Sequence, residues 1–222
     1  MELEFNLQLF GGRGSGLGKA AANWKRQKEP PKYADTEAGM QQMQMDMLGM
    51  SFFAADDYLT ANTYEYTTDT GFLMNEYLRG NANPASLMSA FLEEHIERTD
   101  SAMRASLQDL KLVRGVTYET VEHIFGRSPD KLYAARAEFK GMIYSDKGYT
   151  STSYGGKISK HFHDLDGATI KINAPKGTQL VVPKSEHSNE NEILLARGTS
   201  FKVKKITRAK DGQLVISVDV IK

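Results

Sequence analysis

The chain has 222 residues, of which 40% are hydrophobic and 25% charged, and its 28 Lys or Arg balance 28 Asp or Glu. This composition is typical of a folded domain with a core of its own. The absence of cysteine excludes a disulfide framework, a thiolate nucleophile and any Cys-ligated metal. The longest mostly apolar stretch, residues 47–55, is far shorter than the ~20 residues that cross a bilayer. We therefore expect a globular protein with no membrane segment, and the acidic start gives no sign of a signal peptide.

Charge is unevenly distributed along the chain. Residues 1–32 hold six Lys or Arg and three Asp or Glu, residues 35–100 hold two and twelve, and residues 101–222 hold twenty and thirteen. Either the acidic part is a solvated helical face that docks on the basic part, or the basic part attracts an anionic ligand. Charge alone does not choose between the two.

Residues 1–34 are predicted to be a flexible, Gly-rich basic arm, because the run 11–19 would lose much entropy on ordering. A Walker A loop is excluded, since Arg13 replaces its first glycine and Ala20 its final Ser or Thr. The run 16–21 imitates a dinucleotide fingerprint, but a Pro-Pro pair follows and no second strand completes a βαβ unit. The arm is therefore not predicted to bind a nucleotide.

From residue 35 the pattern becomes helical. Met40, Met43, Met47 and Met50 recur at steps of three and four, which predicts a helix with one buried face. Core packing explains such a stripe more simply than ligation of a soft metal. Further helices are predicted over residues 52–61, 70–78 and 84–104.

Residues 106–222 are rich in β-branched and apolar runs. Strands are predicted over residues 110–116, 149–153, 168–173, 180–182, 192–196, 201–206 and 214–221, and short helices over 118–125 and 157–163. Helices followed by strands, without alternation, indicate an α+β fold with antiparallel sheets. We therefore expect one domain over 35–222, with a helical part (35–105) and a β-rich part (106–222).

Two of these strands carry polar residues in unusual places. Arg114 lies inside an apolar strand, where its permanent charge must meet an anion or solvent, and Gly115 beside it allows a ligand to approach the backbone. On the strand 149–153, Ser151 and Ser153 share one face and Thr152 points to the other. Taken singly, each pattern also fits the solvated face of an ordinary strand.

A third strand begins with Glu190 and Glu192, whose side chains project to the same side and repel unless a cation lies near them. Alone, this pair fits a solvated loop. In chain order, however, Arg114, the Tyr-Thr-Ser-Thr-Ser run and the Glu-x-Glu pair resemble the arginine–serine–glutamate class of mono-ADP-ribosyltransferases. That class includes clostridial binary actin-modifying toxins and related insecticidal toxins. The resemblance covers about residues 63–222.

The resemblance implies N-terminal helices packed on two antiparallel β-sheets that enclose an NAD cleft. It places Tyr66 and Asn75 on a helix that contacts the nucleotide, and Phe162 on a loop beside the phosphates and nicotinamide. The sequence also departs from the family pattern. Gly71 stands where many relatives have a second tyrosine, Leu165 where some have a phosphate-binding arginine, and the loop 183–189 has no aromatic residue.

NAD is the implied co-substrate, and the chemistry fits the marked residues. Nicotinamide leaves as a neutral pyridine without a general acid, so the difficulty lies in the oxocarbenium-like ribose. By resemblance, Glu192 stabilises that cation, Ser151 holds Glu192, and Arg114 clamps the phosphates or the nicotinamide ribose. Gly115 presents its backbone to the nicotinamide amide. Thr152 and Ser153, on the same strand as Ser151, complete the expected NAD-binding set.

Glu190 predicts the acceptor. A protonated guanidinium needs a carboxylate to position it and draw off a proton, and in the family Glu-x-Glu accompanies arginine acceptors. The expected reaction is thus a glycosyl transfer: NAD-dependent mono-ADP-ribosylation of an arginine on an acceptor protein. Two alternatives stay open, an NAD glycohydrolase that uses water and a non-catalytic structural component of a phage head.

The phage alternative rests on residues 5–14, which resemble short segments of tailed-phage head-morphogenesis proteins. It predicts that the arm binds phage head proteins and that the enzyme is carried in a virion to the host cytoplasm; secretion as a toxin is the other expected route. No metal is expected, because His161 and His163 lack the spacing of a zincin helix. No nucleic-acid partner is expected either, since residues 202–205 fit an amphipathic strand edge.

Overall fold

The computed structural model describes residues 37–49, 62–82, 85–155, 167–183 and 191–221. Its helices are α2 (Glu37–Leu48), the 3-10 turn η1 (Glu65–Thr67), α4 (Asp69–Arg79), α5 (Ser86–Ala102), α6 (Tyr118–Phe125) and α7 (Pro129–Ala134). Its strands are β1 (Arg104–Ala105), β2 (Leu110–Val116), β3 (Ile143–Ser145), β4 (Thr150–Tyr154), β5 (Ala168–Ala174), β6 (Gln179–Val181), β7 (Glu192–Leu195), β8 (Ser200–Arg208) and β9 (Leu214–Ile221). Within these ranges no helix has the length and apolar character needed to span a membrane.

The strands join in one curled sheet with the order β1-β6-β7-β4-β2-β5-β9-β8-β3. The expected α+β class is confirmed, and the two expected sheets are the two halves of this continuous ladder. One detail differs: β5 and β9 are parallel. The antiparallel β8–β9 hairpin fixes the direction of β9, which then inserts beside β5. Residue patterns within a strand carry no information on such a distant pairing.

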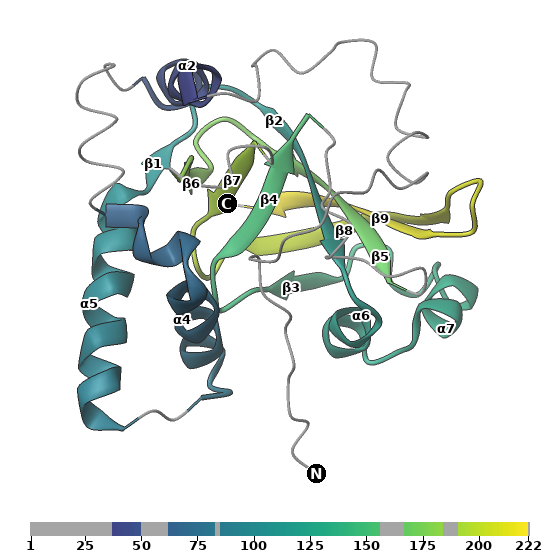
Figure 1. Ribbon diagram of the computed structural model, residues 1–222. Coiled ribbons are helices and arrows are strands. Elements are labelled where there is room, and N and C mark those ends of the chain that lie inside the picture. Colours follow the sequence, from purple (N-terminus) through teal and green to yellow (C-terminus); the bar gives the residue numbers. More distant parts are fainter. Residues whose placement is uncertain (1–36, 50–61, 83–84, 156–166, 184–190, 222) are drawn as a thin grey trace.

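The sheet divides where β2 meets β4. These strands pair at only two positions, Leu112 with Tyr154 and Val113 with Ser153. Beyond them β2 continues along β5, whereas β4 continues along β7. In Figure 1 the two strands diverge from this junction, and β2 runs toward α6 while the start of β4 lies toward α4. Arg114 and Val116 in the later part of β2 and Thr150 at the start of β4 line the same cavity.

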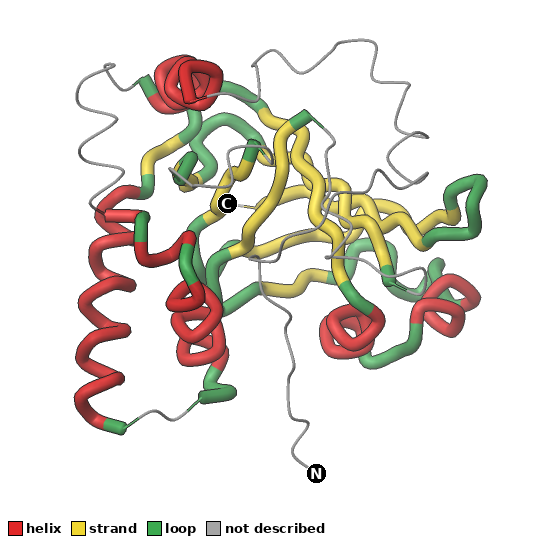
Figure 2. The backbone as a smooth tube through the Cα atoms, in the orientation of Figure 1, coloured by secondary structure: helices red, strands yellow, loops and turns green. Residues whose placement is uncertain are grey.

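Helices pack on the flanks of the sheet, as Figure 2 shows. Helix α2 buries Met43 and Met47 completely in the main core, and the amide of Gln44 donates to the carbonyl of Val182 at 2.9 Å. The methionine stripe is thus core, as predicted, at these two positions. A second cluster packs α4 and α5 against β6, β7 and Tyr149, which precedes β4, through apolar side chains that include Met74, Leu92 and Leu194.

Most of the described elements were predicted from the sequence, including the short strands β6 and β7. Helix α6 has its predicted bounds because the Thr117 side chain caps its start and Gly126, with φ of 65°, ends it. No sequence pattern predicted η1, α7, β1 or β3. The predicted helices over 52–61 and 157–163, and the arm 1–34, lie outside the described residues.

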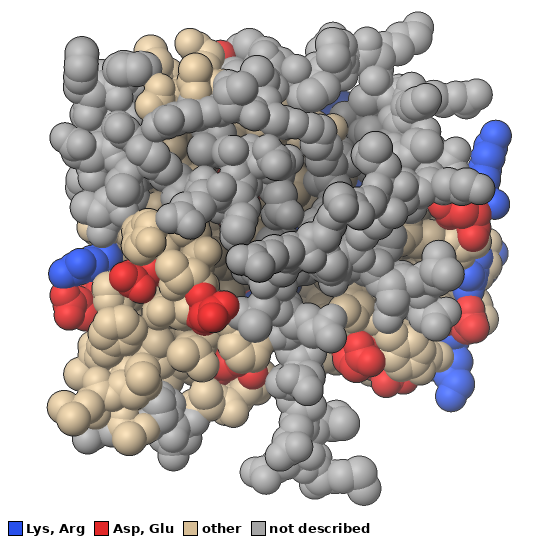
Figure 3. All heavy atoms as spheres, in the orientation of Figure 1, with Lys and Arg blue, Asp and Glu red and all other residues tan. Residues whose placement is uncertain are grey.

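Figure 3 shows acidic side chains over the helical side and also at the opposite edge. On α4 and α5, Asp69, Glu93, Glu94 and Glu97 are exposed. Most of the Lys and Arg side chains drawn in this view lie at the opposite edge. The acidic part is thus a solvated helical face in the described residues, which is one of the two readings of the charge pattern.

Candidate active site

Strands β4 and β7 bring Ser151 and Glu192 into contact. The register pairs Ser153 with Glu192 and Ser151 with Leu194. Since paired and alternate residues share a face, the two serines and the glutamate lie on the same side of the sheet. The hydroxyl of Ser151, which is buried, donates a hydrogen bond to Oε1 of Glu192. The structure thus joins two of the predicted site residues directly.

Glu192 is presented by a special backbone turn. Asn191 has a φ of 44°, a left-handed conformation that Asn tolerates better than most residues. Its carbonyl accepts the Tyr154 amide at 3.0 Å, which ties the turn to the end of β4. Glu190, on the other side of Asn191, lies outside the described residues, as does Phe162.

Asn75 connects α4 to β4 and to η1. Its Nδ2 donates to the Tyr66 hydroxyl at 3.1 Å, and its Oδ1 accepts the Tyr149 amide at 2.8 Å. The rings of Tyr66 and Tyr149 meet edge to face with centroids 5.5 Å apart. Both functional atoms of Asn75 are therefore used within the protein, so its most direct effect is to position the helix on the strand.

The phenol of Tyr66 lies within electrostatic reach of two predicted site residues. Burial raises its pKa most and the charge of Glu192 raises it further, while Asn75, Arg114 and Arg79 act in the opposite direction. Its pKa is well above the usual value, so the hydroxyl keeps its proton at neutral pH. Tyr66 is therefore near both the carboxylate of Glu192 and the guanidinium of Arg114.

Arg114 belongs to a second group of charged side chains, on the opposite face of β4 from Ser151. Its guanidinium lies 3.6 Å from Asp146 Oδ2, and the same carboxylate accepts two hydrogen bonds from Arg79, at 3.0 and 2.9 Å. Burial lowers the pKa of Arg114 and Asp146 opposes this effect. Burial also lowers the pKa of Arg79, but the charge and hydrogen bonds of Asp146, together with Tyr66 and Glu76, outweigh it, so the pKa is raised. Both side chains remain cations at neutral pH.

Arg79 and Asp146 were not predicted as site residues. Asp146 comes two residues before Gly148, an Asp-x-Gly turn that the sequence does show. Its partner Arg79 is 67 residues away in the chain. No local pattern can indicate such a contact, so the pair was accessible only through the fold.

Two glycines permit close packing at helix α4, because a side chain at either position would clash with neighbouring atoms. A Cβ on Gly148 would lie 2.6 Å from Asn75 Oδ1 and 3.1 Å from Arg79 Cζ. A Cβ on Gly71 would lie 2.0 Å from the carbonyl oxygen of Tyr66. The second distance is far too short for any side chain, which explains physically why this chain has no tyrosine at position 71.

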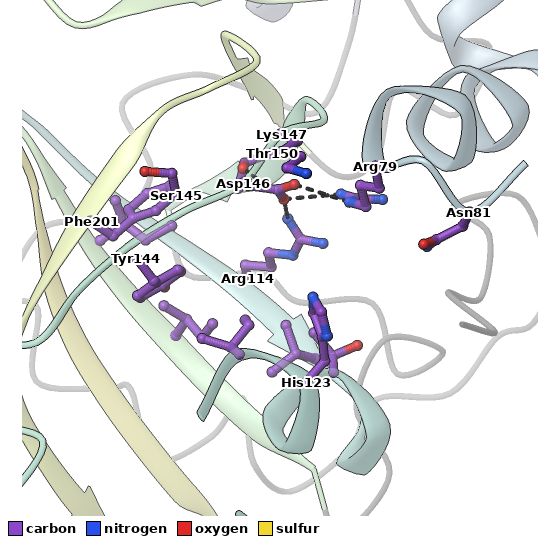
Figure 4. Close-up of a pocket in the computed structure, with 15 residues that line it drawn as sticks. Arg79, Asn81, Arg114, His123, Tyr144, Ser145, Asp146, Lys147, Thr150 and Phe201 are labelled. Atoms are coloured by element: carbon purple, nitrogen blue, oxygen red, sulfur yellow. Dashed lines mark hydrogen bonds and ion pairs between the residues drawn. The ribbon is translucent and has the colours of Figure 1, made fainter. Parts of the chain in front are cut away.

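The cavity lined by β2 and β4 has a volume of about 280 Å³ and lies beside Arg114. Figure 4 shows Arg79 and Arg114 pointing from different elements toward Asp146 at its edge. The apolar lining comes from Val116, Ile124, Tyr144, Ile170, Ile172 and Phe201, and the polar lining from Asn81, Thr120, His123, Ser145, Lys147 and Thr150. Burial and the nearby Arg79 lower the pKa of His123. A cavity with a cationic edge and an apolar interior suits an anion that carries a ring.

Of the other predicted site residues, Gly115 lies next to Arg114 and Thr152 lies next to Ser151. Gly115 pairs with Thr169 within the sheet, next to Arg114. The hydroxyl of Thr152 donates to the carbonyl of Ile193, so it serves the β4–β7 ladder. Ser151 and Glu192 do not line the cavity. The Ser151–Glu192 pair and the charged group of Arg114, Asp146 and Arg79 therefore lie on opposite sides of the start of β4. Among the residues that the structure describes, no three His, Asp or Glu side chains cluster as metal ligands would.

Comparison with known proteins decides the family. A family model described as "ADP-ribosyltransferase exoenzyme" matches residues 56–222. The chain belongs to this family. The three predicted signature residues, Arg114, Ser151 and Glu192, lie on β2, β4 and β7, and their roles stay predictions.

Relatives of known structure share the fold of this family member. The chain is 21% identical over 191 residues to the epidermal cell differentiation inhibitor of Staphylococcus aureus, covering 76% of this chain and 75% of the relative. The crystal structure of C3stau2 from S. aureus with NAD matches with a TM-score of 0.65 and 17% identity, over 87% of this chain and all of that one. The enzymatic component C2-I of the Clostridium botulinum C2-toxin matches with a TM-score of 0.64 and 18% identity, over 86% of this chain and 48% of that one.

Proposed function

We propose that this protein is a mono-ADP-ribosyltransferase that moves ADP-ribose from NAD to an arginine side chain of an acceptor protein and releases nicotinamide. Membership of the exoenzyme family supports the reaction class. The observation that carries the proposal is the hydrogen bond from Ser151 to Glu192 beside a buried cationic group. A structure solved with NAD, C3stau2, has the same fold.

In this proposal the two groups at the start of β4 act on different parts of NAD. Glu192 faces the nicotinamide ribose and stabilises the positive charge that develops as nicotinamide leaves. Ser151 keeps that carboxylate in place before the reaction starts, so no reorganisation is needed at the transition state. Arg114 binds phosphate oxygens on the other side of the strand, and NAD extends past the start of β4 between them.

The arginine acceptor rests on Glu190 and is a proposal from the sequence. Glu190 precedes Glu192 by two residues, in the Glu-x-Glu pattern that accompanies arginine acceptors in the family. A carboxylate at this position orients the guanidinium and takes up its proton as the new bond to ribose C1′ forms. Without it, water remains as an acceptor.

The test combines three proteins and two readouts. Nicotinamide release and transfer of labelled ADP-ribose to bacterial and eukaryotic lysate proteins are measured for the wild type, Glu192→Gln and Glu190→Gln. We expect Glu192→Gln to lose both activities, and Glu190→Gln to lose transfer but retain NAD hydrolysis. Release of the label by neutral hydroxylamine identifies the arginine linkage, and label found exclusively on asparagine or cysteine contradicts the acceptor proposal.

The alternative functions make different predictions in the same experiment. A glycohydrolase releases nicotinamide at the same rate with or without acceptor, and Glu190→Gln leaves it unchanged. A structural phage-head component shows no turnover that Glu192→Gln could remove. The relatives named above are bacterial toxin components and a differentiation inhibitor, so they support the enzymatic reading and give no support to a virion location. Binding of the arm to phage head proteins stays a prediction.

A further inference from the structure

One partly buried carboxylate, that of Asp146, is shared by two cationic side chains from distant parts of the chain. Its Oδ1 accepts Arg79 Nε and the Gly148 amide, both at 3.0 Å. Its Oδ2 accepts the second Arg79 nitrogen at 2.9 Å and the Thr150 hydroxyl at 3.2 Å, and it lies 3.6 Å from Arg114. The arginines come from the last turn of α4 and from β2, and Asp146 from the connection between β3 and β4.

This arrangement leaves one positive charge in excess at the edge of the cavity. The side chains of Arg79 and Arg114 are each 12% exposed and that of Asp146 is 18% exposed. Among the described residues neither arginine forms an ion pair with another carboxylate. Largely buried charges need a partner of opposite sign, and the cavity beside them, with its apolar interior, is where an anionic group can supply it.

The two guanidinium groups differ in how they are held. Arg79 uses its planar fork on both carboxylate oxygens, so its orientation is fixed. Arg114 approaches at ion-pair distance without a hydrogen bond to Asp146, so within the described part of the chain its donors stay available to a ligand. In Figure 4 the Arg114 guanidinium lies between Asp146 and the cavity. Without the shared carboxylate the two cations would repel each other across a poorly solvated space.

We propose that Asp146 is a positioning residue that fixes Arg79 and Arg114 as one cationic pair for the diphosphate of the dinucleotide. The proposal rests on the proposed function for the identity of the ligand. Asp146 has no role as a proton acceptor in it, because donors from Arg79, Gly148 and Thr150 already occupy its oxygens. Its action on NAD passes through the two arginines.

The main test is Asp146→Asn in the full-length protein. Asn preserves the size of the side chain and one oxygen but removes the charge that holds two cations together. NAD binding is measured by calorimetry, and KM and kcat by nicotinamide release. We expect the NAD dissociation constant and KM to rise about 10- to 100-fold, with kcat within about threefold of the wild type, because the groups that contact the ribose are unchanged.

Asp219→Asn is the matched control. The Asp219 carboxylate accepts hydrogen bonds from Asn173 at 2.8 Å and pairs with Lys204 at 2.9 Å, on strands outside the cavity. The same chemical change there should leave NAD binding and turnover as in the wild type. A general effect of removing a paired carboxylate would instead appear in both variants.

Arg79→Lys provides a second variant if Asp146→Asn folds poorly. Lysine retains the charge but loses the two-pronged contact with the carboxylate, so it should weaken NAD binding about as much as Asp146→Asn. In the double variant the two losses should be far from additive, since both remove the same contact.

The outcomes separate the possible errors. Tighter NAD binding by Asp146→Asn would show that the carboxylate merely repels phosphate. Unchanged binding together with a lower melting temperature would show a purely structural residue, and unchanged KM in Arg79→Lys would overturn the fixed pair. If the wild type itself neither binds NAD nor releases nicotinamide, the proposed function fails instead, and calorimetry with inorganic pyrophosphate still tests the cationic pair.

Discussion

The hydroxyl of Ser151 determines where the carboxylate of Glu192 points. This bond crosses from β4 to β7 between side chains on the same face, so both backbones hold it in place. A carboxylate without such an anchor samples other rotamers and loses stabilising power at the transition state. In the proposed mechanism, the residue with the chemical role and the residue that orients it are thus on neighbouring strands.

Ser151→Ala should reduce kcat for nicotinamide release by about 10- to 100-fold while changing KM little. The reason is that Glu192 keeps its charge but loses its fixed direction. Steady-state kinetics with NAD measures kcat and KM separately. Ser217→Ala, on β9 outside the cavity, provides the same substitution as a control, and wild-type kcat in Ser151→Ala would contradict the anchoring role.

Asp146 should also leave a signature in the pH dependence of stability. Burial alone would raise its pKa, but the charges of Arg79 and Arg114 and the donated hydrogen bonds hold it below the usual value. The folded chain therefore gives up this proton more readily than the unfolded chain. The resulting stabilisation is complete above the unfolded pKa of about 3.9 and is lost as pH falls through the lower folded pKa.

Urea unfolding of the wild type and Asp146→Asn from pH 7 to pH 2 checks this expectation. The difference in unfolding free energy should be constant between about pH 5 and pH 7 and should shrink below about pH 4. A difference that grows on acidification would show that the carboxyl is protonated in the folded protein.

Helix α4 is the element on which the site depends most. It contributes Asn75 to the contact with β4 and Arg79 to the cationic pair, four residues apart on one face. Close approach of this face to the chain before β4 requires a residue without a side chain at position 148. One glycine therefore controls two contacts of the same helix.

Gly148→Ala should move α4 away from β4, because its Cβ would lie 2.6 Å from Asn75 Oδ1 and 3.1 Å from Arg79 Cζ. We expect a loss of about 1–3 kcal/mol in unfolding free energy together with a higher KM for NAD. Chemical denaturation and nicotinamide release measure the two effects. Retention of wild-type values for both would show that α4 adapts without disturbing the site.

The sequence predicted elements well wherever local chemistry decides them. Helix α6 follows from the Thr117 cap and Gly126, and the faces of Ser151 and Ser153 follow from alternation along one strand. What it could not predict depends on distant partners: the parallel pairing of β5 with β9, and Asp146 with Arg79. Arg114 was found because a permanent charge inside an apolar strand is unusual, whereas Asp146 in a turn is ordinary.

For the molecule as a whole, helix α2 packs in the main core although the family model begins at residue 56. Met43 and Met47 are fully buried in the core, and the carbonyl of Met47 accepts the Leu107 amide at 2.8 Å. Loss of each buried methionine costs about 2–5 kcal/mol, which is a large share of the stability of a typical domain.

Two truncations test this boundary and the predicted arm together. Removal of residues 1–34 should leave the melting temperature and nicotinamide release unchanged, whereas removal of residues 1–49 should give an unstable or unfolded product. Thermal unfolding followed by circular dichroism compares them. A stable, active product that lacks residues 1–49 would show that α2 is dispensable.

The place of β9 in the middle of the sheet has a consequence for biosynthesis. Because β9 lies between β5 and β8, the ladder that supports the cavity cannot close until Ile221 has left the ribosome. A nascent chain that has not yet released β9 should therefore consume no dinucleotide. Stalled or prematurely terminated products should be equally inert, so the producing cell would be exposed to the activity only after the last strand is in place.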